Sequence, residues 1–167
     1  MALNQAAAWK HLFALVPKGN FSFSKEVALG IHKIAGKEEA LDWGAFRTGN
    51  VTISGSEYEP PYPGELDKVW GEIEAEVNAC HDIYDRAITA FLRMARAQVF
   101  WDVNKRMGRF MMNGILLAAG FPIINVPAKK QKEFNQLMLD FYSSGEMAAM
   151  NQFLRGCINP KIIENFK

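Results

Sequence analysis

The stretch QVFWDVNKRMGRF, residues 98–110, mixes charged and aromatic side chains in an unusual way. Its acid, amide and cations lie close together: Asp102, Asn104, Lys105, Arg106 and Arg109. Apolar residues lie on both sides of them: Val99, Phe100, Trp101 and Phe110, with Met111 directly after the stretch. A core helix would not carry so many guanidinium groups, and a solvated loop would not carry so many aromatic rings. The stretch therefore indicates a charged site held against a hydrophobic core.

Helical periodicity surrounds this stretch on both sides. Residues 83–100 are apolar over a wide arc and residues 109–120 nearly all round, which predicts a helix at the centre of a bundle. Amphipathic patterns predict four further helices, over 24–36, 65–77, 132–145 and 146–158. Ser24 is a favourable N-cap for the first of these. We expect an all-α bundle that forms a single domain over residues 1–167.

Residues 50–58, NVTISGSEY, depart from the helical pattern. Apolar and polar side chains alternate over Val51, Thr52, Ile53 and Ser54. A turn signal follows at Gly55, and a proline cluster beyond it cannot continue a β-ladder. The pattern predicts a short β-hairpin, whose free edge could accept an extended segment of another protein. A plain connecting loop fits the same residues.

The composition excludes several classes of protein. The chain has 167 residues, of which 49% are hydrophobic and 22% charged, as in an ordinary globular domain. A net charge of +1 argues against a surface for duplex nucleic acid or for anionic lipid. No stretch reaches the ~18 apolar residues of a membrane helix, and the N-terminus lacks the features of a signal peptide. Cys80 and Cys157 match no metal or disulfide pattern, so we expect free thiols in a cytoplasmic protein.

The turn at residues 101–105 has the chemistry of an anion site. It joins two apolar helices, and the start of a helix presents unpaired N–H groups and a partial positive charge that favour phosphate. Asn104 adds an amide, Lys105 a point charge, and Arg106 a guanidinium fork that fits phosphate oxygens. Arg109 follows three residues later, on the same helix face. These residues could converge on one polyphosphate.

Asp102 is out of place in such a site, because a carboxylate repels phosphate. A Mg²⁺ ion held by one carboxylate and by the phosphates of the ligand would remove the conflict. The residues therefore predict a pocket for a Mg²⁺–nucleotide polyphosphate at a helix start. An ordinary helix cap, formed by Asp102 or Asn104 and flanked by surface arginines, fits the same spacing.

Residues 98–109 resemble the signature of the Fic/Doc family, His-x-Phe-x-Asp/Glu-Gly-Asn-Gly/Lys-Arg-x-x-Arg, which lies between two core helices. The positions that match in register are Phe100, Asp102, Asn104, Lys105, Arg106 and Arg109. Upstream, residues 46–63 are similar to the family's Arg-x-x-x-Val segment, flap hairpin and Pro-Pro. Downstream, residues 109–138 resemble the helix, loop and helix that follow the signature. The resemblance covers roughly residues 24–156.

The resemblance implies a compact helical bundle with a flap beside the active loop, and transfer of AMP from ATP to a hydroxyl of a target protein. Asp102 would hold Mg²⁺, and the backbone over 103–106, from Val103 through Asn104 and Lys105, would form the anion hole. Arg106 and Arg109 would bind the terminal phosphates. The flap edge at 51–54 would align the target segment.

Two positions depart from the family pattern. Gln98 stands where the family has the histidine that takes the proton from the attacking hydroxyl, and an amide cannot accept a proton. Loss of a general base costs ~10²–10⁴-fold in rate, so we expect an inactive or strongly slowed enzyme. Val103 replaces a glycine, and a β-branched residue resists positive φ. The three histidines of the chain, His11, His32 and His81, are distant from the signature in sequence.

Two other functions fit the same residues. One is a catalytically silent module that binds a nucleotide or a protein. The other is the phosphate transfer of the Doc branch, in which a lysine also stands at the position of Lys105. Ser22 and Glu26 have the spacing of the family's inhibitory motif, but Val27 breaks it and the segment also fits a core helix. An antitoxin-like inhibitor or self-association could restrain the chain instead.

Overall fold

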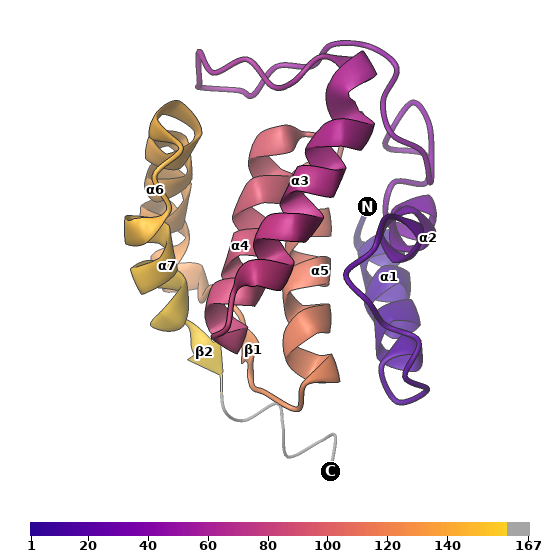
Figure 1. Ribbon diagram of the computed structural model, residues 1–167, viewed down its shortest axis with the longest axis vertical. Coiled ribbons are helices and arrows are strands. Elements are labelled where there is room, and N and C mark those ends of the chain that lie inside the picture. Colours follow the sequence, from indigo (N-terminus) through magenta and orange to yellow (C-terminus); the bar gives the residue numbers. More distant parts are fainter. Residues whose placement is uncertain (160–167) are drawn as a thin grey trace.

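The computed structural model describes residues 1–159, which fold into seven α-helices (Figure 1). The helices are α1 (Ala2–Leu15), α2 (Lys25–Ala35), α3 (Leu66–Ala79), α4 (Ile83–Ala97), α5 (Asn104–Ala118), α6 (Gln131–Ser144) and α7 (Ala148–Arg155). Short 3₁₀ turns, η1 (Pro63–Glu65) and η2 (Ala128–Lys130), precede α3 and α6. Strands β1 (Ile123–Ile124) and β2 (Ile158–Asn159) form one antiparallel pair. The all-α class expected from the sequence is confirmed.

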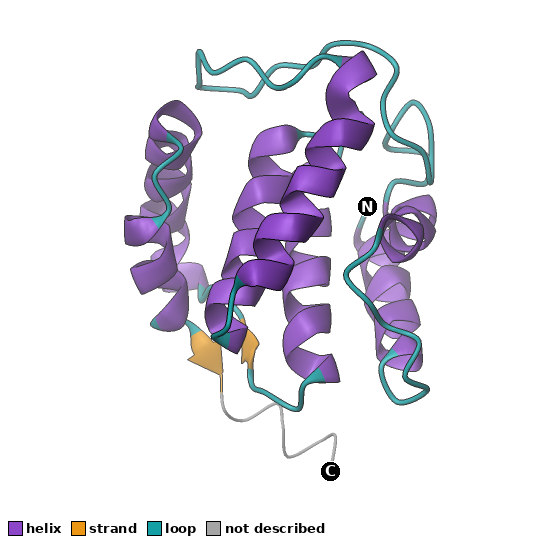
Figure 2. Ribbon diagram, in the orientation of Figure 1, coloured by secondary structure: helices purple, strands orange, loops and turns teal. Residues whose placement is uncertain are grey.

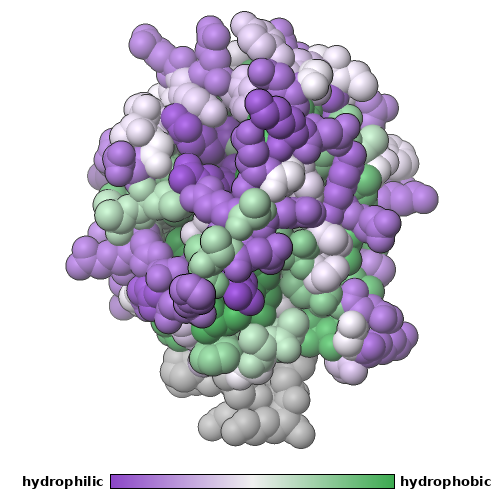
Figure 3. Space-filling model, viewed as in Figure 1, coloured by the Kyte–Doolittle hydropathy of each residue, from purple (hydrophilic) through white to green (hydrophobic). Residues whose placement is uncertain are grey.

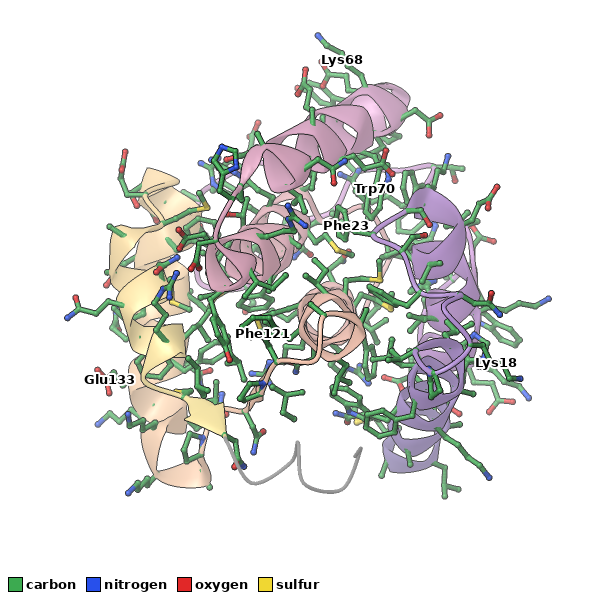
Figure 4. The ribbon with its side chains drawn as sticks, turned by 60° about the horizontal axis from the view of Figure 1, so that its bottom comes forward. Lys18, Phe23, Lys68, Trp70, Phe121 and Glu133 are labelled. Carbon is green, nitrogen blue, oxygen red and sulfur yellow. The ribbon has the colours of Figure 1, made fainter. Side chains whose placement is uncertain are left out.

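Helices α4 and α5 form the centre of the bundle. Helices α1 and α2 lie on one side of them and α6 and α7 on the other (Figure 1). Figure 4 views α5 almost end-on, with the other helices arranged around it. A Cβ atom at Gly108 of α5 would lie 2.8 Å from the Phe91 ring of α4 and 3.0 Å from the Phe91 carbonyl oxygen. This glycine lets the two central helices approach closely. The position of α5 at the centre agrees with its nearly uniform apolar pattern.

Aromatic side chains join the outer helices to this centre. Trp9 of α1 packs edge-on against Phe110 of α5, with ring centroids 4.9 Å apart. Phe23 stacks on Trp70 of α3 at 5.3 Å, and both are labelled in Figure 4. Trp9 ties α1, a helix that the sequence patterns did not predict, into the core.

The expected helices are present with several revised ends, and the last of them, predicted over 146–158, covers only Ala148–Arg155. Ser24 caps α2 as predicted, since its hydroxyl accepts a hydrogen bond from the Val27 N–H at 3.3 Å. Helix α4 ends at Ala97 and α5 begins at Asn104, so the turn between them covers residues 98–103. Gln98 and Val103 take left-handed backbone conformations, with φ of 48° and 60°, and these end one helix and start the next. The turn is therefore more sharply bounded than periodicity predicted.

The long loop between α2 and η1 crosses the end of the bundle where α4 meets α5 (Figure 2). It contains the predicted flap, residues 50–58. The expected turn is present, with φ of 81° at Gly55 and a hydrogen bond from the Ser56 N–H to the Ile53 carbonyl of 3.1 Å. However, residues 50–58 contain no paired strand, and the antiparallel pair lies elsewhere, with Ile124 opposite Ile158. The flap is a turn rather than a β-ladder.

Arg47 explains how this loop is held without a ladder. Its side chain is 2% exposed and donates hydrogen bonds to the carbonyl oxygens of Gly49, Pro61 and Gln98. Its backbone N–H donates to the Val99 carbonyl at 2.9 Å. One guanidinium thus binds both ends of the flap and the turn after α4. Pro60 and Pro61 lack an N–H and could not have donated ladder bonds.

Polar side chains cover the loop end of the face shown in Figure 3, whereas apolar side chains gather in its lower half.

Cys80 and Cys157 are free, as expected. In residues 1–159, no helix has the length and apolar character needed to span a bilayer.

Candidate active site at the start of helix α5

A cleft of about 650 Å³ opens between the flap, the turn after α4 and helix α6. Flap residues 51–54 form one wall, and Gln98 with residues 101–106 forms the floor. The third wall is a face of α6, made by Asn135, Met138, Leu139 and Tyr142. The turn at Gly55 approaches α6 closely, because a Cβ atom there would lie 3.2 Å from the Leu139 side chain. The fold therefore brings together all the predicted site residues except Arg109.

A network of amide hydrogen bonds closes the turn between α4 and α5. The Asn104 side chain, 6% exposed, accepts from the Phe100 N–H and donates to the Phe100 carbonyl, both at 2.9 Å. It also donates to the Gln98 side-chain oxygen at 3.1 Å. The Gln98 amide nitrogen donates to the Ala95 carbonyl at 2.6 Å. Both amides are thus used within the loop, and Asn104 fixes its shape instead of offering the free donor that we expected.

Val103 adopts the conformation that its position would normally reserve for glycine. With φ of 60° and ψ of 22°, it lies in the left-handed region, where a β-branched residue is strained. Its N–H donates to Oδ1 of Asp102 at 2.6 Å. Val103 therefore holds, at a cost in backbone energy, a left-handed conformation that glycine would adopt without strain.

The first turn of α5 presents positive charge to the cleft. Among the described residues, no side chain caps this helix, so its first N–H groups remain available to an anion. Lys105 lines the cleft. Burial, and then the charge of Arg109, lower the pKa of Lys105 below its usual value. The negative charge of a bound anion would oppose both effects.

Arg106 is engaged by a carboxylate that the motif does not contain. Its guanidinium donates two hydrogen bonds to Glu39, of 2.6 and 3.3 Å, and the two side chains are only 25% and 14% exposed. The Arg106 hydrogen bond lowers the pKa of Glu39 and keeps it ionised. Glu39 comes from the loop after α2, 67 residues earlier.

Arg109 lies behind the cleft. It lines a separate cavity of about 100 Å³, together with Arg106, Trp9 and Asn113. Its guanidinium lies over the Phe134 ring, 4.8 Å from the centroid. Burial lowers its pKa. Arg106 lines both cavities, so the two arginines are neighbours, but only Arg106 faces the cleft floor.

His32 of α2 contacts the turn from the core side. It is fully buried, and its ring stacks on Phe100 at 3.9 Å with an interplanar angle of 9°. Nδ1 accepts a hydrogen bond from the Gly44 N–H at 3.0 Å, and Nε2 lies 3.3 Å from the Asp102 carbonyl oxygen. Burial lowers the pKa of His32 from 6.5 to about 4, so the ring is neutral.

Comparison with known proteins agrees with this geometry. The family model described as "Fic/DOC family" matches residues 22–116, more than half of the chain. The chain belongs to the Fic/DOC family. A protein named protein adenylyltransferase Fic from Aedes aegypti is 27% identical over 158 residues, covering 90% of this chain and 31% of that protein. Its namesake from Drosophila yakuba is 25% identical over 134 residues, covering 77% and 26%. The chain thus spans between a quarter and a third of the length of these relatives.

Solved Fic proteins share the fold. Fic-1 from C. elegans superimposes with a TM-score of 0.78 at 19% identity, covering 98% of this chain and 49% of that one. The BepC protein of Bartonella tribocorum, solved with bound AMPPNP, gives a TM-score of 0.66 at 16% identity and covers 93% and 88%.

The Fic resemblance located the cleft floor and the flap from sequence. It did not find Glu39, the His32 contact or the α6 wall, because each comes from a segment far from the motif. A weak signal for the wall was present, since Asn135 and Tyr142 are polar groups on an otherwise apolar helix face. Burial raises the pKa of Tyr142 to about 12, so its hydroxyl stays protonated and can donate.

Ser22 and Glu26, the partial inhibitory motif, are exposed, and their segment begins the core helix α2.

Proposed function

We propose that this Fic domain binds Mg²⁺–ATP in the cleft at the start of α5 and has the architecture for AMP transfer to a protein hydroxyl, with the rate strongly lowered by Gln98. The observation that carries the proposal is the convergence of the uncapped α5 start, Lys105 and Arg106 on one cleft beneath the flap. Relatives of this chain are named protein adenylyltransferases, which supports the same chemistry.

The triphosphate would lie against the floor of the cleft. The N–H groups of residues 104–106 supply hydrogen bonds, and Lys105 supplies a point charge. Arg106 would exchange the Glu39 carboxylate for phosphate oxygens. Arg109 is assigned to the terminal phosphates by the family pattern, and its position beside Arg106 allows it to support that end of the site through charge.

The nucleoside would lie against α6. Met138 and Leu139 offer an apolar surface, and Asn135 and Tyr142 offer polar groups at its edges. This combination suits a heterocyclic base, which stacks on apolar side chains and is oriented by a few hydrogen bonds.

The cleft also suits a magnesium ion. Among the described lining residues Asp102 is the only acid, and no cluster of three or more metal-ligating side chains occurs in residues 1–159. One carboxylate together with substrate phosphates is a usual environment for Mg²⁺. Asp102 would hold the ion, whose charge, when bound, offsets that of the phosphates. The Val103 N–H already holds one carboxylate oxygen of Asp102 in place.

In AMP transfer, a target hydroxyl oxygen bonds to the α-phosphorus, the bond to the bridging oxygen breaks, and pyrophosphate leaves. The hydroxyl proton must go to a base. The Gln98 amide cannot take it, and its oxygen is already occupied by Asn104. Flap residues Val51, Thr52, Ile53 and Ser54 would align the target segment, and Thr52 and Ser54 are exposed for this contact.

Labelled transfer tests the proposal. The chain and its Gln98→His variant are incubated with Mg²⁺, a cell lysate and ATP labelled at either the α- or the γ-phosphate. We expect α-label on protein ~10²–10⁴-fold faster with Gln98→His, because a general base contributes that factor. Gln98→Asn, a shorter amide, is the matched control and should gain nothing. Equal rates for the unmodified chain and Gln98→His would contradict the assigned role of position 98.

The same experiment separates the two alternatives. Transfer of γ-label in place of α-label would identify a Doc-like phosphotransferase. No transfer by either chain, with Mg²⁺–ATP still bound, would identify a silent binding module. The amide network of Gln98 and Asn104 favours the silent module as the second candidate, since it holds the Gln98 side chain within the turn and offers no group that can take up a proton at the position of the base. An antitoxin-like inhibitor or self-association stays a prediction for either case.

A further inference from the structure

The buried His32 makes two hydrogen bonds that join separate loops. Its Nδ1 faces the Gly44 N–H at 3.0 Å, and its Nε2 faces the Asp102 carbonyl oxygen at 3.3 Å. A backbone N–H is always a donor, so Nδ1 must be the acceptor and the ring proton must reside on Nε2. Nε2 therefore donates to the Asp102 carbonyl.

The ring has little freedom to leave this position. Its face stacks on Phe100, and its edge lies against Gly36, where a Cβ atom would come within 2.8 Å of Nε2. The histidine is held between α2, the following loop and the active-site turn. Its hydrogen bonds are thus fixed in direction as well as in partner.

The Asp102 carbonyl belongs to the Asp102–Val103 peptide, whose orientation decides which backbone group faces the cleft. The peptide is trans, so its carbonyl and the Val103 N–H point in opposite directions. With the carbonyl turned to His32, the N–H points toward the cleft, where it donates to Oδ1 of Asp102. Rotation of this peptide would turn the N–H away from the carboxylate and would replace it with a carbonyl oxygen, which repels phosphate.

Val103 makes such a rotation favourable unless something opposes it. Its φ of 60° is strained for a β-branched residue, and turning the peptide over would bring φ back to a negative value. We propose that His32 is the positioning residue that holds the Asp102–Val103 peptide, and with it the Asp102 carboxylate, in the orientation that the nucleotide site requires. The part of this inference that concerns nucleotide affinity rests on the proposed function.

Two amide substitutions at His32 separate positioning from packing. Asn places its amide near Nδ1, so His32→Asn keeps an acceptor for Gly44 but cannot reach Asp102. Gln places its amide near Nε2, so His32→Gln keeps a donor for Asp102. Each variant removes the aromatic ring and one hydrogen bond, so each serves as a control for the other, although Asn is smaller than Gln by one methylene group. Urea unfolding measures the stability that each variant loses.

The readouts are the φ angle of Val103 in crystal structures of both variants and the affinity for Mg²⁺–ATP by calorimetry. We expect His32→Asn to reverse the sign of φ at Val103 and to weaken binding about tenfold (about 1.4 kcal/mol). His32→Gln should keep positive φ and bind within about twofold of the unmodified chain. In a Val103→Gly background, where positive φ carries no strain, the loss caused by His32→Asn should shrink to about threefold or less.

The inference is overturned if His32→Asn keeps the positive φ of Val103, or if the two variants weaken binding equally. If His32→Asn does not fold, His32→Gln decides alone, and a folded His32→Gln protein that has lost the positive φ overturns the inference. If the unmodified chain binds no Mg²⁺–ATP, the proposed function fails, and the φ angles still decide whether His32 holds the peptide.

Discussion

The end of α4 and the start of α5 lie on either side of one short turn, yet they differ in what they offer a substrate. At the end of α4, the Gln98 amide is held by Asn104 and by the Ala95 carbonyl. At the start of α5, helix N–H groups, Lys105 and Arg106 face the cleft without a cap. In the proposed function, binding and catalysis would therefore depend on separate residues of the same turn, and a chain could keep the first while losing the second.

Acid should disturb the turn that joins these two regions. Folding lowers the pKa of His32 from 6.5 to about 4, so the unfolded chain takes up a proton there first as the pH falls. The contribution of the neutral ring, about 3 kcal/mol, is complete above pH 6.5 and is lost as the pH falls toward 4. Urea unfolding across this range would show the decline. His32→Gln should reduce its slope, whereas substitution of the exposed His81 should not.

Loss of Arg106 should weaken nucleotide binding, which the start of α5 provides. Arg106→Gln deletes charge-assisted hydrogen bonds to phosphate, each worth about 1.5–3 kcal/mol, so Mg²⁺–ATP affinity should fall at least about tenfold. Calorimetric titration measures it, with Lys132→Gln on the exposed start of α6 as the control for charge. An unchanged affinity would mean that the cleft floor does not hold the phosphates.

The strain at Val103 can be measured by comparing two small residues. Val103→Ala loses most of the buried side chain and keeps the left-handed strain, whereas Val103→Gly loses the side chain and the strain together. The glycine variant should be the more stable in urea, by about 1 kcal/mol, which reverses the usual order of these residues. If alanine is the more stable, Val103 does not hold the loop in a strained conformation.

Glu39 gives the smallest expected effect. Its carboxylate occupies Arg106, so Glu39→Gln should raise the affinity for Mg²⁺–ATP by about twofold to fivefold. Glu38→Gln makes the same change of charge at the neighbouring, exposed position and should have no such effect. Equal responses of the two variants would show that net charge, not the Arg106 contact, sets the affinity.

The sequence predicted what depends on local pattern. The helix periods, the Ser24 cap and the turn at Gly55 are encoded within a few residues, and the structure contains each of them. The signature likewise located Asp102, Lys105 and Arg106 on one cleft floor. The Fic resemblance added the flap wall, because the flap and the signature occur together in the family.

Contacts between distant segments could not be predicted in this way. Glu39 and Arg106 are 67 residues apart, and His32 and Asp102 are 70 apart. The sequence around either residue of such a pair gives no indication of its partner. The flap strands were expected from alternation, whereas Arg47 holds this loop through the carbonyl groups of Gly49 and Pro61, on either side of the predicted hairpin. Helix α1 was missed because its contact with the core, Trp9 on Phe110, is tertiary.

The most direct test of the separation between binding and catalysis is a calorimetric titration of Mg²⁺–ATP into the unmodified chain, followed by analysis of the nucleotide in the same sample. We predict saturable, Mg²⁺-dependent binding of one nucleotide per chain, and recovery of that nucleotide as intact ATP. Absence of binding would contradict the role assigned to the start of α5. Transfer of AMP by the unmodified chain as fast as by Gln98→His would contradict the role assigned to the end of α4.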